Sequence, residues 1–167
     1  IALQDTGDTP LRLGDIARVT KNDPQVSNSS NKRNFSLLGD VALELNYPEH
    51  EVRFTDLPDT LRALESATVG GYISNQWGDS LVVFNGIVHV EVFDKLSQIT
   101  TLNNDDAPNP HTFQVYRNVL FRGVASVSNG AFEFEFIVPR DIDYTFGNGR
   151  ISAYAVSDSS DANGATE

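Results

Sequence analysis

The segment that decides the fold is Val119–Val138, which reads VLFRGVASVSNGAFEFEFIV. Three phenylalanines occupy alternate positions in its second half: Phe132, Phe134 and Phe136. Asn129–Gly130 separates the two halves and readily supplies the positive φ angles of a two-residue turn. An apolar period of two predicts half-buried strands, with Glu133 and Glu135 facing solvent. The segment therefore predicts a β-hairpin that places three aromatic rings in a core.

The same alternation recurs elsewhere in the second part of the chain. In Gly86–Asp94, Val88, Val90 and Val92 share one face and are the expected core residues. Further strands are predicted at Glu51–Thr55, Ala67–Ser74, Leu81–Phe84, Thr112–Tyr116 and Gly149–Val156. About seven short strands in about 107 residues are typical of an immunoglobulin-like or fibronectin-like β-sandwich. The predicted fold class is therefore mainly β.

The first 50 residues have a different pattern of apolar and polar residues. Leu11–Thr20 has apolar residues at helical spacing and predicts a short amphipathic helix. Asp23–Asn34 is polar and predicts a loop. Gly39–Asp40 is a turn signal between an apolar run, Phe35–Leu38, and an alternating strand pattern, Ala42–Tyr47. We expect a short α/β remnant of another domain over residues 1–50, a sandwich over 51–157 and an acidic polar tail over 158–167.

Composition limits the possible functions. The chain of 167 residues has 12 Lys and Arg against 23 Asp and Glu, a formal net charge of −11. Nucleic-acid binding needs clustered basic residues, so this charge argues against it. No apolar stretch reaches the roughly 18 residues that a membrane-spanning helix needs. The chain contains no Cys and no Met, and we expect it to be a fragment of a larger protein.

Motifs at both ends of the chain carry a family resemblance. They are Leu11–Ile16, Asn31–Leu45 with its Leu-Leu-Gly-Asp core, Tyr47–Pro48, and Phe132–Ala155 with Val138-Pro139 and Gly147-Asn148-Gly149. Together they resemble the gingipain-like cysteine peptidases, and most of all the sortase-type signal peptidase of the type IX secretion system of Bacteroidetes. Val41 stands where the family often has Pro.

The resemblance implies both a fold and a setting. In this family a caspase-like peptidase domain is followed directly by an immunoglobulin-like domain, so residues 1–50 would be the caspase-like remnant, with Asn31–Leu45 as its closing strand-turn-strand. The parent enzyme would be a cysteine endopeptidase that cleaves secretion signals from cargo proteins at the bacterial outer-membrane surface. The family's catalytic His and Cys lie upstream of these motifs, so the resemblance gives this chain no catalytic residue.

The chain's own residues also argue against catalysis. Without Cys there is no thiolate nucleophile. A serine triad would need one of the three histidines, His50, His89 or His111, but no Gly-x-Ser-x-Gly elbow presents a serine. We interpret all three as surface histidines. Whether the parent is an active enzyme stays open, and this chain alone is predicted to be inactive.

Short acidic pairs are candidates for a weak calcium site, and no other cofactor is predicted. The pairs are Asp105–Asp106, Asp141 with Asp143, and Asp158 with Asp161. Loop carboxylates are common calcium ligands, but Asp also stabilises turns by accepting from nearby backbone N–H groups. The latter interpretation is favoured for any one pair, and the last two pairs are the better candidates.

Four residues are candidates for contact with a partner. Lys32 and Arg33 lie in the polar loop, where simple solvation is the alternative. Trp77 lies in an expected hairpin turn, Ser74–Asp79, and either contacts a partner or folds back over the sandwich edge. With Tyr72 it would also form a platform for a sugar ring.

Two functional hypotheses follow. In the first, the chain is the C-terminal, non-catalytic part of a type IX sortase-like peptidase, and the sandwich supports the upstream catalytic domain or docks other secretion components. In the second, it is a free-standing adhesion or carbohydrate-binding module. Residues 1–50 resemble half of a domain, which favours the first. Exposed apolar residues in Phe35–Leu45 would also permit an oligomer formed by exchange of this segment.

Overall fold

The structure of the chain is a computed structural model that describes residues 12–24, 34–45, 47–102 and 110–166. It divides into two units, Ile1–Tyr47 and Pro48–Glu167. Lys32, Arg33 and the pair Asp105–Asp106 lie outside the described residues. In the described part, no helix is long and apolar enough to cross a membrane.

The described residues of the first unit include the helix α1 (Leu13–Asn22) and an irregular segment over residues 35–45. Asp15 lies in the first turn of α1 and Lys21 in the last, where each charge opposes the helix dipole. The first free N–H groups of the helix are satisfied by backbone, because Leu13 N donates to Leu43 O at 2.9 Å and Gly14 N to Val41 O at 3.0 Å. The predicted helix is therefore confirmed.

The strands predicted on either side of Gly39–Asp40 are wrong for the described residues, although a turn forms there. Asp40 Oδ1 accepts from Ala42 N at 2.8 Å, but the pairing of the following segment is limited to a single bridge between Glu44 and Arg12. Carbonyl groups of this segment bind the start of α1 instead of a neighbouring strand. Capping thus takes the place of strand pairing.

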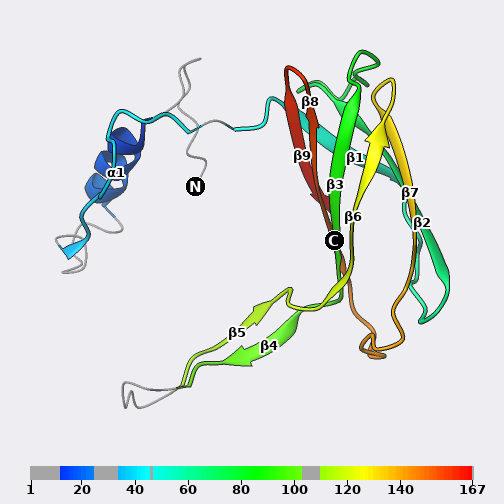
Figure 1. Cartoon of the computed structure of the whole chain (residues 1–167). Helices are drawn as coiled ribbons and strands as arrows, with labels where there is room; N and C mark the ends of the chain where they lie inside the picture. Colours follow the sequence, from blue (N-terminus) through cyan, green and yellow to red (C-terminus); the bar gives the residue numbers. More distant parts are fainter. Residues whose placement is uncertain (1–11, 25–33, 46, 103–109, 167) are drawn as a thin grey trace. The chain divides into compact units, whose positions relative to one another are not determined.

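The second unit is a β-sandwich (Figure 1). Its strands are β1 (His50–Asp56), β2 (Ser66–Ser74), β3 (Gly86–Phe93), β4 (Ser97–Thr100), β5 (Thr112–Val115), β6 (Val119–Val127), β7 (Ala131–Ile137), β8 (Arg150–Ser157) and β9 (Asp161–Thr166). Seven strands form one sheet in the order β6-β3-β8-β9-β1-β2-β7, and β4 and β5 form a separate two-stranded sheet. The link between β9 and β1 is parallel and has only two residue pairs. The sheet folds over at this short link, which brings its two halves face to face.

The folded sheet has two layers, β7-β2-β1 and β6-β3-β8-β9, with the core between them. Phe121 of β6 stacks on Phe136 of β7, with ring centroids 4.9 Å apart. The predicted core residues of β3 and β7 are buried, and Glu133 and Glu135 are exposed. The mainly β class and the immunoglobulin-like sandwich are therefore confirmed.

The pairing predicted for Val119–Val138 needs correction. Asn129 (φ 51°) and Gly130 (φ 77°) form the expected turn. Past a single bridge beside the turn, however, β6 pairs with β3 and β7 with β2, so the two strands enter opposite layers. The alternating pattern showed that both strands are half-buried, but it carried no information on which strand each one pairs with.

Other segments also differ from prediction. Leu81–Phe84 forms turns rather than a strand. The end of the chain, expected to be an acidic tail, forms β9, which pairs with β8 and β1. Its small residues permit close packing, because a Cβ on Gly164 would lie 2.1 Å from Val52 O. Small and polar residues do not form a recognisable apolar pattern, which is why β9 was missed.

Candidate functional site

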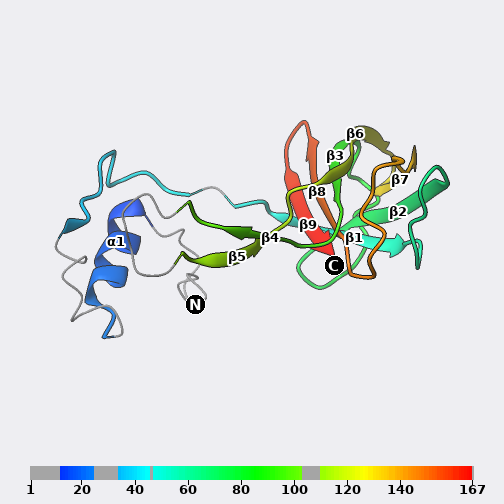
Figure 2. The same cartoon turned by 90° about the horizontal axis from the view of Figure 1, so that it is seen from below.

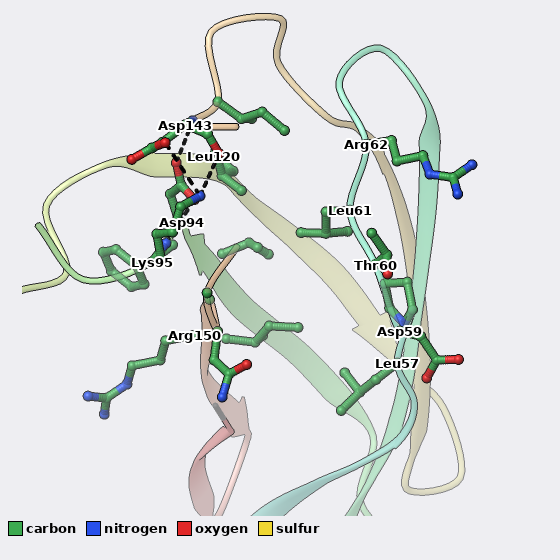
Figure 3. A pocket seen from close by; sticks show the side chains of 18 of the residues that line it. Leu57, Asp59, Thr60, Leu61, Arg62, Asp94, Lys95, Leu120, Asp143 and Arg150 are labelled. Atoms are coloured by element: carbon green, nitrogen blue, oxygen red, sulfur yellow. Dashed lines mark hydrogen bonds and ion pairs between the residues drawn. The ribbon is translucent and has the colours of Figure 1, made fainter. Parts of the chain in front are cut away.

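A cavity of 860 Å³ lies at one end of the sandwich, between the β1–β2 loop (residues 57–65) and the β7–β8 loop (residues 138–149). Its apolar walls come from both layers: Val69 and Phe136 from one, and Val92, Leu120 and Ile151 from the other. Leu57 and Leu61 point into it from the β1–β2 loop (Figure 3). Its volume lies in the range of small-molecule sites.

A polar cluster forms the opposite wall of the cavity (Figure 3). Asp94, only 8% exposed, follows β3. Its Oδ1 accepts from the backbone N of Lys95 at 2.8 Å and from Lys95 Nζ at 3.2 Å, and its Oδ2 accepts from Asp143 N at 3.0 Å. Lys95 Nζ also donates to Asp143 O. The cluster therefore fastens the β7–β8 loop to the end of β3.

Sequence reasoning missed Asp94 and Lys95. Asp94 was placed only as the last residue of a strand pattern, and its partner Asp143 is 49 positions away in the sequence. The one available signal was a charged pair directly after a buried strand, which is a common surface feature. Both side chains form hydrogen bonds that hold the β7–β8 loop in place, so their role in this structure is to position that loop.

In the candidate calcium pair Asp141 and Asp143, Asp143 accepts hydrogen bonds within a turn and Asp141 is exposed. Asp143 Oδ1 accepts from the backbone N and from the hydroxyl of Thr145, both at 2.9 Å. These two bonds from Thr145, with a smaller contribution from the Lys95 charge, lower the pKa of Asp143. The bonding matches the turn interpretation.

In the candidate pair Asp158 and Asp161, the two carboxylates also have different surroundings. Asp161 Oδ2 accepts from the hydroxyl of Tyr154 at 2.8 Å, and its Oδ1 accepts from Glu49 N at 3.3 Å. That hydroxyl bond to Asp161 raises the pKa of Tyr154. Asp158 is exposed in the β8–β9 turn. Within the described residues, no three His, Asp or Glu side chains gather as metal ligands, and calcium binding stays a prediction.

Trp77 is presented on an ordered turn. Asn75 Oδ1 accepts from Trp77 N at 2.9 Å and from Asp79 N at 3.0 Å, so the amide organises the turn. Trp77 is 76% exposed, which excludes the alternative that it folds back over the sandwich edge. Its contact role stays a prediction.

Tyr72 lines a shallow groove with the consecutive glycines Gly70 and Gly71. The hydroxyl of Tyr72 lies 3.5 Å from Gly78 O, at the limit of a hydrogen bond. Trp77 is not one of the lining residues of this groove. Trp77 and Tyr72 therefore do not line the same groove, and the sugar platform stays a prediction.

The three histidines lie in unrelated places. His50 packs edge-on against Phe84, with centroids 6.5 Å apart, and lies 4.0 Å from Glu49. His89 is exposed on β3, and His111 stacks on Phe113. These contacts are those of structural and surface residues. Neither cavity lining includes a histidine.

Comparison with known proteins finds a substantial likeness to a solved structure. No family model and no curated protein sequence matches the chain. The chain is similar to the crystal structure of dimeric latent PorU from Porphyromonas gingivalis, with TM-score 0.63 and 29% identity, over 93% of this chain and 16% of that chain.

Two other solved structures match with TM-scores too low to establish a shared fold. Spo0M, a sporulation control protein from Bacillus subtilis, has TM-score 0.38 and 13% identity over 72% of this chain and 48% of that chain. A β-glucosidase from Listeria innocua in complex with gluconolactone has TM-score 0.31 and 13% identity over 86% and 20%. The chain is thus related in structure to a segment of PorU, and it spans about a sixth of the length of that protein.

Proposed function

We propose that the chain is the C-terminal, non-catalytic portion of a PorU-like sortase of the type IX secretion system, and that its sandwich supports or docks the catalytic domain. The observation that carries the proposal is the likeness to PorU over 93% of the chain at 29% identity. The motifs at both ends of the sequence, which resemble the same group of peptidases, support it. The parent protein would act at the bacterial surface on secretion signals of cargo proteins.

The first unit exposes apolar residues, and this favours its being covered by another domain in the parent protein. No residue of α1 is buried, although the helix is amphipathic. Large apolar side chains of the following segment are exposed, including Phe35 (72%) and Leu38 (93%). Exposed apolar side chains in such a cluster favour a protein interface. In the proposed parent protein the caspase-like domain covers them, and exchange between copies of the segment 35–45 is the alternative that stays a prediction.

The gene region upstream of Ile1 tests the proposal directly. We expect it to encode a His and a Cys in a caspase-like context, and the joined polypeptide to cleave a cargo signal peptide. If the upstream region encodes neither residue, the proposal is wrong.

A complex between the chain and the separately expressed upstream region tests whether the first unit or the sandwich contacts the catalytic domain. We expect binding, measured by calorimetry, to fall at least tenfold for Leu38→Asp. Leu102→Asp is the matched control, because Leu102 is also strongly exposed (86%) but belongs to the second unit. Equal binding by both variants would show that the first unit is not the docking surface.

The exposed Trp77 favours a second candidate, a carbohydrate-binding module. An exposed indole on an ordered turn is a suitable platform for a sugar ring, and the groove beside Tyr72 has the carboxylates Asp56 and Glu133 at its margin. A glycan array tests this candidate. Binding that is lost in Trp77→Ala would support it, whereas an array without signal would remove it.

A further inference from the structure

Four asparagines of the chain are each followed directly by a glycine: Asn85–Gly86, Asn129–Gly130, Asn148–Gly149 and Asn163–Gly164. In such a pair the backbone nitrogen of the glycine can attack the side-chain carbonyl carbon of the asparagine, because glycine has no Cβ to obstruct the approach. The attack needs a glycine N–H without a hydrogen-bond acceptor and a backbone that can rotate. All four asparagines are exposed, so the backbone of each pair must decide its reactivity.

The backbone of Asn129–Gly130 is held at both residues. Gly130 N donates to Phe84 O at 2.8 Å, and Asn129 N donates to Asn85 Oδ1 at 2.9 Å. A nitrogen held in this way reaches the asparagine side chain only when the turn opens, which costs free energy. We therefore expect the β6–β7 turn to protect this pair.

The pairs that begin at Asn85 and Asn163 are restrained by strands. The amide of Asn85 accepts from Asn129 N and donates to Val83 O at 3.1 Å, and Gly86 pairs with both β6 and β8. Asn163 lies in β9, where it pairs with β8 on one side and β1 on the other. Strand pairing on both sides opposes rotation of the peptide groups. These two pairs are also expected to be protected.

Asn148–Gly149 lacks these restraints. It lies in the β7–β8 loop, which projects beyond the ends of β7 and β8 at the opposite end of the sandwich from the β6–β7 turn (Figure 1); Figure 2 looks onto this loop from below. In the part of the chain that the structure describes, neither the Asn148 side chain nor Gly149 N forms a hydrogen bond. The loop is fixed earlier, at Asp143, and again where β8 begins at Arg150. The intervening pair therefore opens at the lowest cost.

We propose that Asn148–Gly149 is a site of spontaneous deamidation in the folded chain. Gly149 N loses its proton to water and bonds to Asn148 Cγ, and the side-chain nitrogen leaves as ammonia, which produces a cyclic succinimide. Water then adds to either carbonyl of this ring and opens it to aspartate or isoaspartate. The reaction consumes water, releases ammonia and adds a carboxylate to the chain. It is independent of the proposed sortase function.

The product changes the wall of the cavity at the end of the sandwich. Asn148, Gly149 and Arg150 all line this cavity. The new carboxylate therefore adds a negative charge at the cavity, on the same wall as Asp94 and Asp143. In the isoaspartate product the main chain also gains a methylene group directly before β8.

Trypsin digestion after incubation in mildly alkaline buffer tests the proposal on the wild-type chain. Cleavage after Arg140 and Arg150 releases residues 141–150, in which Asn148 is the only side-chain amide. Residues 123–140 and 151–167 each contain a protected pair, with Asn129 and Asn163, and are matched controls within the same molecule. By mass spectrometry, we expect conversion of amide to acid at Asn148 to be at least tenfold faster than at either control. Equal rates, or no conversion at Asn148, overturn the proposal.

The same digestion of the chain held in guanidinium separates structure from local sequence. Unfolding removes the restraints on the protected pairs, so their conversion should approach the rate at Asn148. A tenfold preference for Asn148 that persists in the unfolded chain would come from local sequence and would overturn the structural argument.

Asn148→Gln identifies the reacting side chain. It retains the amide, but the added methylene disfavours ring closure, so we expect conversion within residues 141–150 to fall at least tenfold. Because the Asn148 side chain is exposed and forms no hydrogen bond within the described residues, guanidinium unfolding should match that of the wild-type chain. An isoaspartate-specific methyltransferase should label the incubated wild-type peptide and not the variant. Equal labelling of both would place the reaction at another residue, against the proposal.

Discussion

Replacement of Asp94 by Ala tests whether the polar cluster holds the end of the sandwich together. The side chain accepts from Lys95 Nζ, from the backbone N of Lys95 and from Asp143 N. Asp94 and Lys95 have side chains only 10% and 14% exposed, so water replaces the lost bonds poorly. The substitution leaves the Lys95 ammonium partly buried with fewer partners and frees the β7–β8 loop.

The expected cost is about 3 kcal/mol. Removing one member of a buried ion pair costs about 3–5 kcal/mol, and Lys95 keeps its bond to Asp143 O, which places the value at the lower end. For a sandwich of this size that corresponds to a fall in Tm of roughly 9–15 °C. Lys95→Met should cost less, about 1–2 kcal/mol, because the two backbone donors to Asp94 remain.

Guanidinium unfolding followed by circular dichroism measures these changes, and amide exchange at Asp143 reports the loop. Asp141→Ala is the matched control: the residue is exposed on the same loop, and its replacement should change stability by less than about 0.5 kcal/mol. A loss below about 1 kcal/mol in Asp94→Ala, or an equal loss in the control, would refute the reasoning. A double-mutant cycle with Lys95→Met should show a coupling of about 1–2 kcal/mol.

Four other outcomes are expected. Phe136→Ala should cost about 3–5 kcal/mol in guanidinium unfolding, because the buried ring stacks on its neighbours. The pKa of Asp143 is lowered by Thr145, so its contribution is present above the unfolded pKa and is lost as pH falls through the folded pKa; Asp143→Asn should remove this acid dependence. The pKa of Tyr154 is raised by its bond to Asp161, so its contribution is present below the unfolded pKa and is lost as pH rises through the folded pKa; Tyr154→Phe should remove this alkaline dependence. Calorimetry with millimolar calcium tests the predicted acidic pairs, and the absence of heat would reject them.

The sequence predicted the core well wherever a strand buries one face against a strongly apolar layer. Phe132–Phe136 and Val88–Val92 alternate because every second side chain enters the core, and the structure buries those positions. β9 gave no such signal, since the close approach of Gly164 to Val52 O requires small residues. β4, with one apolar residue in four, was missed for a related reason.

Pairing and site geometry were harder to predict than the elements themselves. The turn at Asn129–Gly130 was correct, yet its two strands separate into different layers, because local alternation does not specify a partner. The cluster around Asp94 depends on a contact with the distant β7–β8 loop. By contrast, the order within the Trp77 turn comes from Asn75, two residues away, and such local bonding was in principle readable from the sequence.

The two units differ in what they need from another protein. The sandwich has a continuous buried core, and both end strands of its main sheet carry charged residues that oppose the addition of another strand. The first unit exposes Phe35 and Leu38 and buries no residue of its helix, a surface suited to a permanent interface.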